Sequence, residues 1–185
     1  MFTDDKPYKI HWELTDICNL KCPMCPRTDH NNHCRPSGNL KHVQFSLEDV
    51  KQTLPQQFLE RIKRIDFCGN FGDPCMARDF HEICTYLTGI NRIPVMISTN
   101  GAMRREDWWK QLAITLSGTD SWIAFHIDGL EDTNHFYRRG ANWDQLMKNC
   151  SAFISAGGRA EWHFLVFDHN KHQIERARSI ATTIG

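Results

Sequence analysis

The chain has 185 residues, 41% of them hydrophobic, and this length suits one domain that buries roughly two-thirds of its unfolded surface. Lysine plus arginine and aspartate plus glutamate number 22 each, so no net charge attracts the chain to nucleic acid or to an anionic membrane. The sequence has neither the apolar run of a signal peptide at its start nor the roughly 20 apolar residues of a membrane span. We therefore expect a soluble, cytoplasmic protein.

Short apolar runs alternate with segments of helical pattern along the whole chain. The predicted strands are residues 9–14, 65–68, 94–98, 122–127 and 161–167. The predicted helices are residues 47–63, 78–88, 106–114, 143–156 and 171–184. This order is typical of strand-helix units around a parallel sheet.

Two segments interrupt the regular pattern. Ser46 is a plausible start for the first helix, but Pro55 lies inside it and removes a backbone hydrogen bond, so we expect a kink or a split there. Residues 26–45 are rich in Asn, His, Gly and Pro and form the longest irregular stretch. Its length predicts a functional loop rather than a simple connection.

Three closely spaced cysteines follow the first predicted strand. Cys18, Cys22 and Cys25 have the spacing C-x3-C-x2-C. In a chain without a secretion signal, such a group indicates metal binding or catalysis, and it encloses no long loop that a disulfide would stabilise. Three thiolates can hold three corners of one iron-sulfur cube, which leaves one iron without a nearby protein ligand. An open iron can bind a substrate or cofactor.

This spacing, directly after the first strand, resembles the signature of the radical S-adenosylmethionine (SAM) superfamily. The resemblance implies a [4Fe-4S] cluster held by Cys18, Cys22 and Cys25, with SAM chelating the open iron. It also implies that an electron from the cluster cleaves SAM to methionine and a 5′-deoxyadenosyl radical, which abstracts a substrate hydrogen. Met24 stands where the family usually has an aromatic residue, at the backbone expected to meet the adenine.

A zinc site is the alternative interpretation of the cysteine group. Cys34, His30 or His33 could join the three cysteines as the fourth ligand of a closed tetrahedral site. The chain would then be a non-catalytic zinc or iron-sulfur binding module.

The turn after the second strand supports the resemblance. Phe71, Gly72, Asp73 and Pro74 are similar to the family's Gly-Gly-Glu-Pro motif, with aspartate in place of the longer glutamate. The resemblance implies that this turn receives the methionine end of SAM, whose ammonium would meet Asp73. Taken alone, Gly-Asp-Pro is a common turn sequence.

The third strand ends in Ser98, Thr99 and Asn100, followed by Gly101. Family members often carry Thr-Asn-Gly there, and polar side chains at the carboxyl end of a parallel strand face the site. The resemblance therefore makes Ser98, Thr99 and Asn100 candidate SAM contacts. The structural alternative is that they bond the turn and cap the next helix.

The fourth strand ends in Asp128, and Arg138 and Arg139 follow it. The resemblance makes Asp128 and one arginine, Arg138, candidates to meet the ribose or carboxylate of SAM, although His126 stands where serine is usual. An arginine can hold a carboxylate through two parallel hydrogen bonds. The sequence alone does not decide between the two arginines.

The remaining candidates are weaker. Asn170 lies in a stretch similar to one in the peptide-modifying and molybdenum-cofactor branches, and we expect it to cap the last helix. Cys68 and Cys75 flank the glycine turn and are predicted to line the cavity. Two others, Cys84 and Cys150, lie on helical segments and are predicted to be core residues.

These observations predict an open, partial (β/α) TIM-like barrel with about five of the usual six strand-helix units, and its site at the carboxyl ends of the strands. Residues 1–185 would form a radical SAM core domain that is incomplete at its C-terminus, with the last strand at an exposed edge prone to association. The expected partners are SAM, a flavodoxin- or ferredoxin-like electron donor, and an unidentified substrate for which a peptide is the favoured class.

Overall fold

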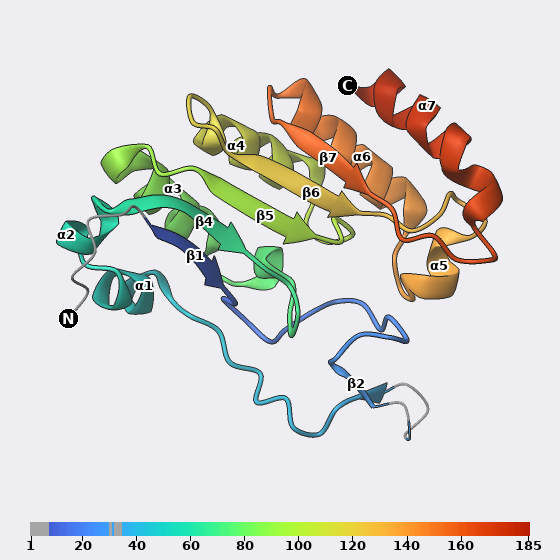
Figure 1. The fold of residues 1–185 in the computed structure, drawn as a ribbon, viewed down its shortest axis with the longest axis horizontal. Coiled ribbons are helices and arrows are strands. Elements are labelled where there is room, and N and C mark those ends of the chain that lie inside the picture. The colour runs from blue at the N-terminus through green and yellow to red at the C-terminus, as the bar shows by residue number, and fades with distance from the viewer. Residues whose placement is uncertain (1–7, 30, 32–34) are drawn as a thin grey trace.

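A computed structural model describes residues 8–29, 31 and 35–185. Its centre is a parallel sheet in the order β1-β4-β5-β6-β7 (Figure 1). Because β1 and β7 lie at opposite edges, the sheet is open, which confirms the predicted partial barrel. The strands are β1 (Tyr8–Trp12), β4 (Ile62–Phe67), β5 (Val95–Thr99), β6 (Trp122–His126) and β7 (Ala160–His163).

Helices connect these parallel strands, as a parallel order requires. They are α1 (Leu47–Thr53), α2 (Gln56–Leu59), α3 (Phe80–Asn91), α4 (Glu106–Leu116), α5 (Asn134–Tyr137), α6 (Trp143–Ser155) and α7 (Ile174–Ile184). Two short 3-10 helices are η1 (Pro74–Met76) and η2 (Lys171–Gln173). Two residue pairs form the antiparallel ribbon of β2 (Thr28–Asp29) and β3 (Arg35–Pro36).

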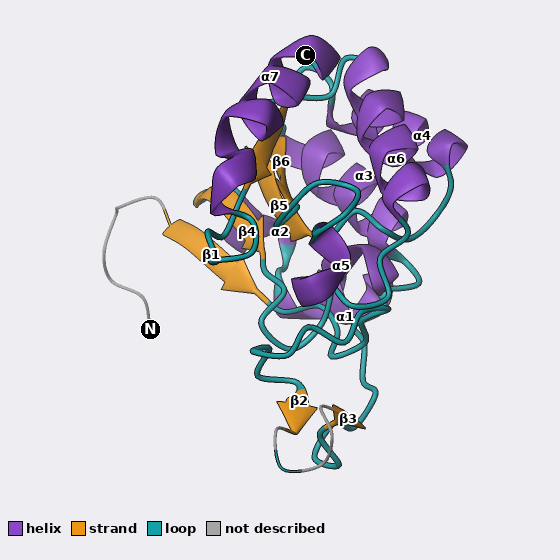
Figure 2. Ribbon diagram, turned by 90° about the vertical axis from the view of Figure 1, so that its right-hand side faces the viewer, coloured by secondary structure: helices purple, strands orange, loops and turns teal. Residues whose placement is uncertain are grey.

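The hydrophobic core lies between the sheet and helices α3, α4 and α6, which cover one face of it (Figure 2). In β5, Val95 and Ile97 are buried toward this core, and the alternate residues Met96 and Ser98 are only half-buried. Successive side chains of a strand point to opposite faces of the sheet, so the half-buried residues lie on the face away from this core. There the neighbouring strands carry Asp66 in β4 and His126 in β6.

The first predicted helix, residues 47–63, is split at Pro55, as expected, but it ends before residue 63. Ser46 caps α1 through reciprocal hydrogen bonds with Asp49, so the predicted start is confirmed. The helix ends at Thr53, and Pro55 begins the separate short helix α2. The chain then enters β4 at Ile62.

The last predicted strand, residues 161–167, is too long. β7 ends at His163 because side-chain oxygens, rather than a neighbouring strand, accept hydrogen bonds from the backbone amides that follow. The amide of Leu165 donates to Asp128 Oδ1 at 2.6 Å, and the amide of Phe167 donates to Asn170 Oδ1 at 2.6 Å. The apolar run therefore continues as a loop that is tied to the end of β6.

Within the described residues, no helix combines the length and apolar character needed to cross a membrane. The carboxyl ends of β1, β4, β5 and β6 point to the same side of the molecule, where their connecting loops and α5 lie (Figure 1). The residues predicted to be functional lie on these loops or close to them, with Ser98 and Thr99 at the end of β5 and Pro74 in η1.

Candidate functional site

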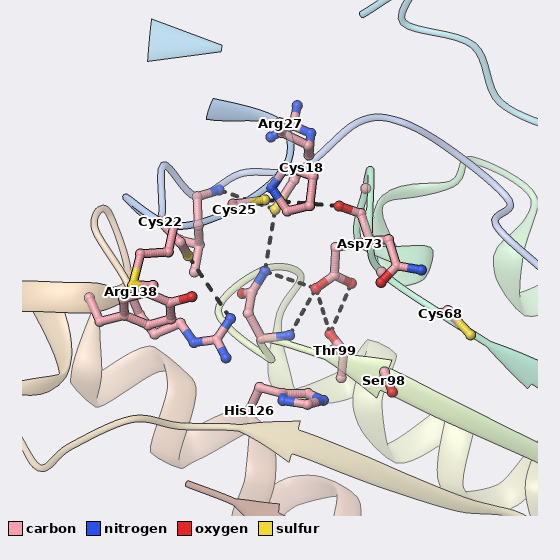
Figure 3. Close-up of a pocket in the computed structure, with 18 of the residues that line it drawn as sticks. Cys18, Cys22, Cys25, Arg27, Cys68, Asp73, Ser98, Thr99, His126 and Arg138 are labelled. Atoms are coloured by element: carbon pink, nitrogen blue, oxygen red, sulfur yellow. Dashed lines mark hydrogen bonds between the residues drawn. The ribbon is translucent and has the colours of Figure 1, made fainter. Parts of the chain in front are cut away.

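A cavity of about 340 Å³ lies at the carboxyl ends of the strands. Parallel α/β proteins place their ligands at this edge. Figure 3 shows side chains from the loops after β1, β4, β5 and β6 converging on it. Its lining includes three cysteines and three polar residues: Cys18, Cys22, Cys25, Asp73, Asn100 and Arg138.

All three cysteines of the C-x3-C-x2-C motif line this cavity as free thiols. A tight turn holds them, because the amide of Cys25 donates to the carbonyl of Cys22 at 3.2 Å. Thr28 fixes the same turn through its hydroxyl, which donates to the Cys22 carbonyl at 2.8 Å. The predicted grouping of the cysteines is therefore present.

The surroundings of these thiols suit a metal-sulfur group. Burial, helped by the negative charge of Asp73, raises the pKa of Cys18 to about 12, and burial also raises the pKa of Cys22. Such thiols keep their protons near neutral pH until a metal displaces them. Three soft sulfur donors facing one cavity match the chemistry of iron-sulfur ligation.

The zinc alternative requires ligands that converge on one ion. Within residues 8–29, 31 and 35–185, no group of three or more His, Cys, Asp or Glu residues is arranged to hold a single metal ion. A cube differs in this respect, since each thiolate binds a different iron. The fourth zinc ligands considered, His30, His33 and Cys34, lie outside the described residues.

The glycine turn after β4 packs directly on the cysteine loop. A Cβ atom at Gly72 would overlap the backbone carbonyl of Thr15, so only glycine allows this approach. The amide of Asp73 donates to the carbonyl of Ile17 at 2.9 Å. The carboxylate of Glu13 holds the same turn by accepting hydrogen bonds from the backbone amides of Asn70 and Phe71.

Asp73 is buried, and the protein's own donors surround its carboxylate. The hydroxyl of Thr99 donates to both oxygens at 2.9 and 3.0 Å, and the amide of Cys75 donates to one of them at 3.1 Å. Asn100 adds two donors at 2.8 Å, its backbone amide and its side-chain Nδ2. Asp73 therefore fixes the end of β5, and its predicted contact with the SAM ammonium stays a prediction.

Asn100 carries this connection to the cysteine loop. Its Nδ2 lies 3.7 Å from Cys18 Sγ and donates to Asn19 Oδ1 at 3.0 Å. Behind it, Asn149 in α6 is fully buried and donates to the carbonyls of Gly101 and Met103 at 2.8 and 3.0 Å. Asp73 and Asn19 thus orient the Asn100 amide group directly, and Asn149 holds the backbone that follows it.

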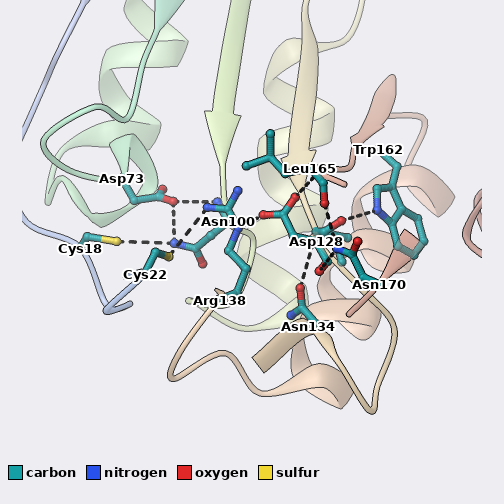
Figure 4. A network of polar contacts seen from close by, with 11 residues as sticks. Cys18, Cys22, Asp73, Asn100, Asp128, Asn134, Arg138, Trp162, Leu165 and Asn170 are labelled. Carbon is teal, nitrogen blue, oxygen red and sulfur yellow. Dashed lines mark hydrogen bonds and ion pairs between the residues drawn. The ribbon is translucent and has the colours of Figure 1, made fainter. Parts of the chain in front are cut away.

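A second chain of contacts reaches Cys22 from the end of β6 (Figure 4). Asp128 is fully buried, and its Oδ2 accepts a 2.5 Å hydrogen bond from Arg138 Nε. The Nη1 atom of the same guanidinium lies 3.9 Å from Cys22 Sγ. Of the two arginines, Arg138 lines the cavity and Arg139 is exposed, and the contact of Arg138 with SAM stays a prediction.

The other predicted contacts divide into two groups. Met24, Gly72, Ser98 and Thr99 line the cavity with the residues already described, and Met24 is 70% exposed at its mouth. The cavity lining does not include Pro74, which begins the buried helix η1, or Asp128, which lies behind Arg138.

Two of the weaker predictions are wrong. Cys68 lines the cavity as expected, but Cys75 is completely buried in the hydrophobic core. Asn170 does not cap the last helix. Its amide instead donates to the carbonyls of Asp128 and Leu165, which joins the loop after β7 to β6.

Among the residues of the cavity wall to which sequence reasoning assigned no role are Arg27, Tyr137 and His126. Arg27 is buried and donates to the Asp16 carbonyl at 3.0 Å, and its position two residues after Cys25 was the available signal. Tyr137 lies next to Arg138 on the short helix α5. His126 points into the cavity, where burial, with the charge of Arg138, lowers its pKa to about 4.

Comparisons with known proteins give this site a family context. The profile of the radical SAM superfamily matches residues 12–179. Mycofactocin maturase MftC of Mycolicibacterium smegmatis is 25% identical over 184 residues, which cover 98% of this chain and 43% of the relative. GTP 3′,8-cyclase of Mannheimia succiniciproducens is 25% identical over 158 residues, covering 81% of this chain and 42% of the relative. The chain therefore spans less than half the length of these relatives.

Solved structures show the same fold. The chain of anSMEcpe with bound AdoMet superposes with a TM-score of 0.69 at 17% identity, covering 94% of this chain and 46% of that one. Streptococcus suis SuiB bound to S-adenosylmethionine gives a TM-score of 0.69 at 16% identity, covering 97% of this chain and 37% of that one. Since the profile match extends from β1 into α7, this chain belongs to the radical SAM superfamily, a superfamily of enzymes that use a [4Fe-4S] cluster and SAM.

Proposed function

We propose that this chain binds a [4Fe-4S] cluster through Cys18, Cys22 and Cys25 and cleaves SAM reductively in the adjoining cavity. The observation that carries the proposal is that these three thiols open into one cavity with polar groups from the ends of β4, β5 and β6. When bound, the cluster supplies an electron to the sulfonium of SAM, which yields methionine and a 5′-deoxyadenosyl radical that abstracts a hydrogen atom from the substrate.

The chain's own residues provide the binding groups for SAM. Arg138 presents a planar set of donors that suits a carboxylate, and Ser98, Thr99 and Asn100 supply hydroxyl and amide groups at the end of β5. The close approach of Gly72 lets backbone groups face the ligand. The cavity volume of about 340 Å³ is within the usual range for small-molecule sites.

We further propose that the substrate is a peptide. The support is the similarity to mycofactocin maturase MftC over 98% of this chain, together with the likeness in fold to anSMEcpe, which has been solved with bound Cp18Cys peptide. The similarity to GTP 3′,8-cyclase makes a nucleotide the class to compare in the same assay. A flavodoxin- or ferredoxin-like protein as electron donor, cytoplasmic location and a single core domain stay predictions.

The test is a SAM-cleavage assay on protein reconstituted without oxygen and reduced with dithionite. Cys18→Ala, Cys22→Ala and Cys25→Ala should each abolish formation of 5′-deoxyadenosine, because each removes a cluster ligand. Cys84→Ala is the matched control, since Cys84 is buried on α3 away from the cavity and should keep the activity. A fully loaded wild-type protein that releases no 5′-deoxyadenosine would instead identify a non-catalytic module.

A further inference from the structure

Two of the three cluster cysteines have a nitrogen donor of another side chain within reach of the sulfur. Cys18 Sγ is 3.7 Å from the amide of Asn100, and Cys22 Sγ is 3.9 Å from the guanidinium of Arg138. The two donors differ in charge, because the amide is neutral and the guanidinium is always positive. Of these two contacts, the one at Cys22 therefore brings a full positive charge against a cluster ligand.

The guanidinium is fixed in this orientation. Arg138 is 15% exposed, and its Nε donates to Asp128, which has no exposed surface. Asp128 is itself immobilised, because its other oxygen accepts the Leu165 amide at 2.6 Å and its own amide donates to Asn134 Oδ1 at 2.9 Å. A buried and doubly anchored ion pair of this kind holds its charge in one place.

The geometry of the pair directs its positive end toward the cluster loop. The carboxylate of Asp128 lies behind Arg138 and is absent from the cavity lining, whereas Arg138 and Cys22 both line the cavity. The Nη1 atom of the guanidinium faces Cys22 Sγ at 3.9 Å, whereas the carboxylate of Asp128 contacts the Nε atom of Arg138. The nearest fixed charge that Cys22 meets is thus positive.

We propose that Arg138 sets the reduction potential of the cluster by directing its guanidinium at Cys22 Sγ, with Asp128 as its positioning residue. The inference rests on the proposed function, since it needs the cluster on Cys18, Cys22 and Cys25. Hydrogen bonds to the sulfurs and nearby charge are known determinants of cluster potential. Reduction adds negative charge, so a positive group beside a ligand stabilises the reduced state and raises the potential.

The experiment is a redox titration of the reconstituted cluster in the absence of SAM. Any role of Arg138 in binding SAM then has no effect on the measured potential. Wild type is compared with Arg138→Gln, Arg138→Lys and the matched control Arg139→Gln, which removes an exposed arginine next in sequence. We expect Arg138→Gln to shift the midpoint to a more negative potential. Arg138→Lys should shift it less because it keeps the charge, and Arg139→Gln should leave it unchanged.

Each other outcome has a definite meaning. Equal midpoints for wild type and Arg138→Gln would overturn the proposal, as would an equal shift in Arg139→Gln. If Arg138→Gln holds no cluster, Arg138→Lys carries the test, and loss of the cluster from both folded variants would show that Arg138 only holds the loop. A wild-type protein that binds no iron-sulfur cluster would contradict the proposed function before any potential is measured.

Discussion

Among the glycines that the structure describes, Gly72 has the least room for a side chain. An added Cβ would overlap the Thr15 carbonyl and also press on the amide of Ile17, which are backbone atoms that cannot move away without displacing the cysteine loop. By contrast, a Cβ at Gly89 in α3 would meet nothing within 4 Å. Alanine substitution at the two glycines therefore compares a methyl group in a crowded site with the same methyl group in open space.

We expect Gly72→Ala to lower the free energy of unfolding by about 1 to 3 kcal/mol, the usual cost of overpacking. It should also reduce iron loading, because the cysteine loop is displaced. Gly89→Ala should raise stability by about 0.5 to 1 kcal/mol, because alanine is the better residue inside a helix. Urea denaturation and iron analysis of both variants provide the measurement. Normal loading in Gly72→Ala would show that the cysteine loop tolerates the displacement.

His126 should make the stability of the protein depend on pH. Its pKa is lowered to about 4 in the folded chain, mainly by burial, and is about 6.5 in an unfolded chain. Between these values the unfolded state binds more protons, so the contribution is complete above about pH 6.5 and is lost as the pH falls toward 4. From pH 7 to pH 5, His126 should cost up to about 2 kcal/mol of stability.

The variant His126→Asn carries no titrating group at this position. Its free energy of unfolding should therefore fall less between pH 7 and pH 5 than that of wild type, because the other histidines contribute equally to both proteins. Urea denaturation at the two pH values gives the difference. The same pH dependence in both proteins would place the pKa of His126 near its ordinary value.

At the scale of elements, helix α6 supports the site although it contributes no residue to the cavity wall. Its Asn149 has no exposed surface and binds the carbonyls of Gly101 and Met103, which follow Asn100 in the chain. Replacing Asn149 by alanine would remove the donor of the buried Gly101 carbonyl, whereas the Met103 carbonyl would keep the hydrogen bond from Trp109 Nε1 at 3.0 Å. A buried carbonyl without a donor costs about 1 to 3 kcal/mol.

Asn149→Ala should therefore destabilise the protein by about 1 to 3 kcal/mol. The control on the same helix is Lys148→Ala, an exposed position where the change should stay within about 0.5 kcal/mol. Thermal or urea unfolding of the pair measures the difference. A similar effect in both variants would mean that helix propensity, rather than the buried amide, decides the result.

The strands and longer helices could be predicted from sequence because apolar periodicity and strand-helix alternation are local signals. β5 and β6 agree with their predicted positions to within about one residue, whereas the length of β7 could not be predicted. That strand ends where the carboxylate of Asp128, distant in sequence, captures the Leu165 amide. Helix α5 was missed because its length, from Asn134 to Tyr137, is too short for an amphipathic period.

The same distinction holds for the candidate site. Motif spacing identified the three cysteines and the polar ends of β5 and β6, since each motif lies within a few residues of a strand end. The packing partner Asn149 was not predictable, because it supports the loop after β5 from a helix without a motif. Likewise, the position of Arg138 at the cavity wall depends on a buried ion pair with Asp128 that the fold creates.

At the scale of the whole molecule, the sheet ends in β7 on one side, as predicted for the last strand. Just beyond it, Leu165 and Val166 are 48% and 58% exposed. Unpaired strand edges with exposed apolar residues favour association with another chain. We therefore expect this chain to associate at high concentration through the region around β7.

A charged residue at this edge should weaken the association. Val166→Lys should lower the apparent mass in light scattering at high concentration without lowering the melting temperature. The matched control is Ile114→Lys, because Ile114 is 55% exposed on α4 and lies away from the edge. An equal reduction by both variants would attribute the association to general surface hydrophobicity.

The central claim is that Cys18, Cys22 and Cys25 together hold an iron-sulfur cluster with one open iron. Anaerobic reconstitution followed by metal and sulfide analysis tests this most directly. We predict about four irons and about four sulfides per chain, with loading lost when any one of the three cysteines is replaced. Binding of about one zinc ion per chain with no sulfide would contradict the claim and restore the four-ligand zinc site.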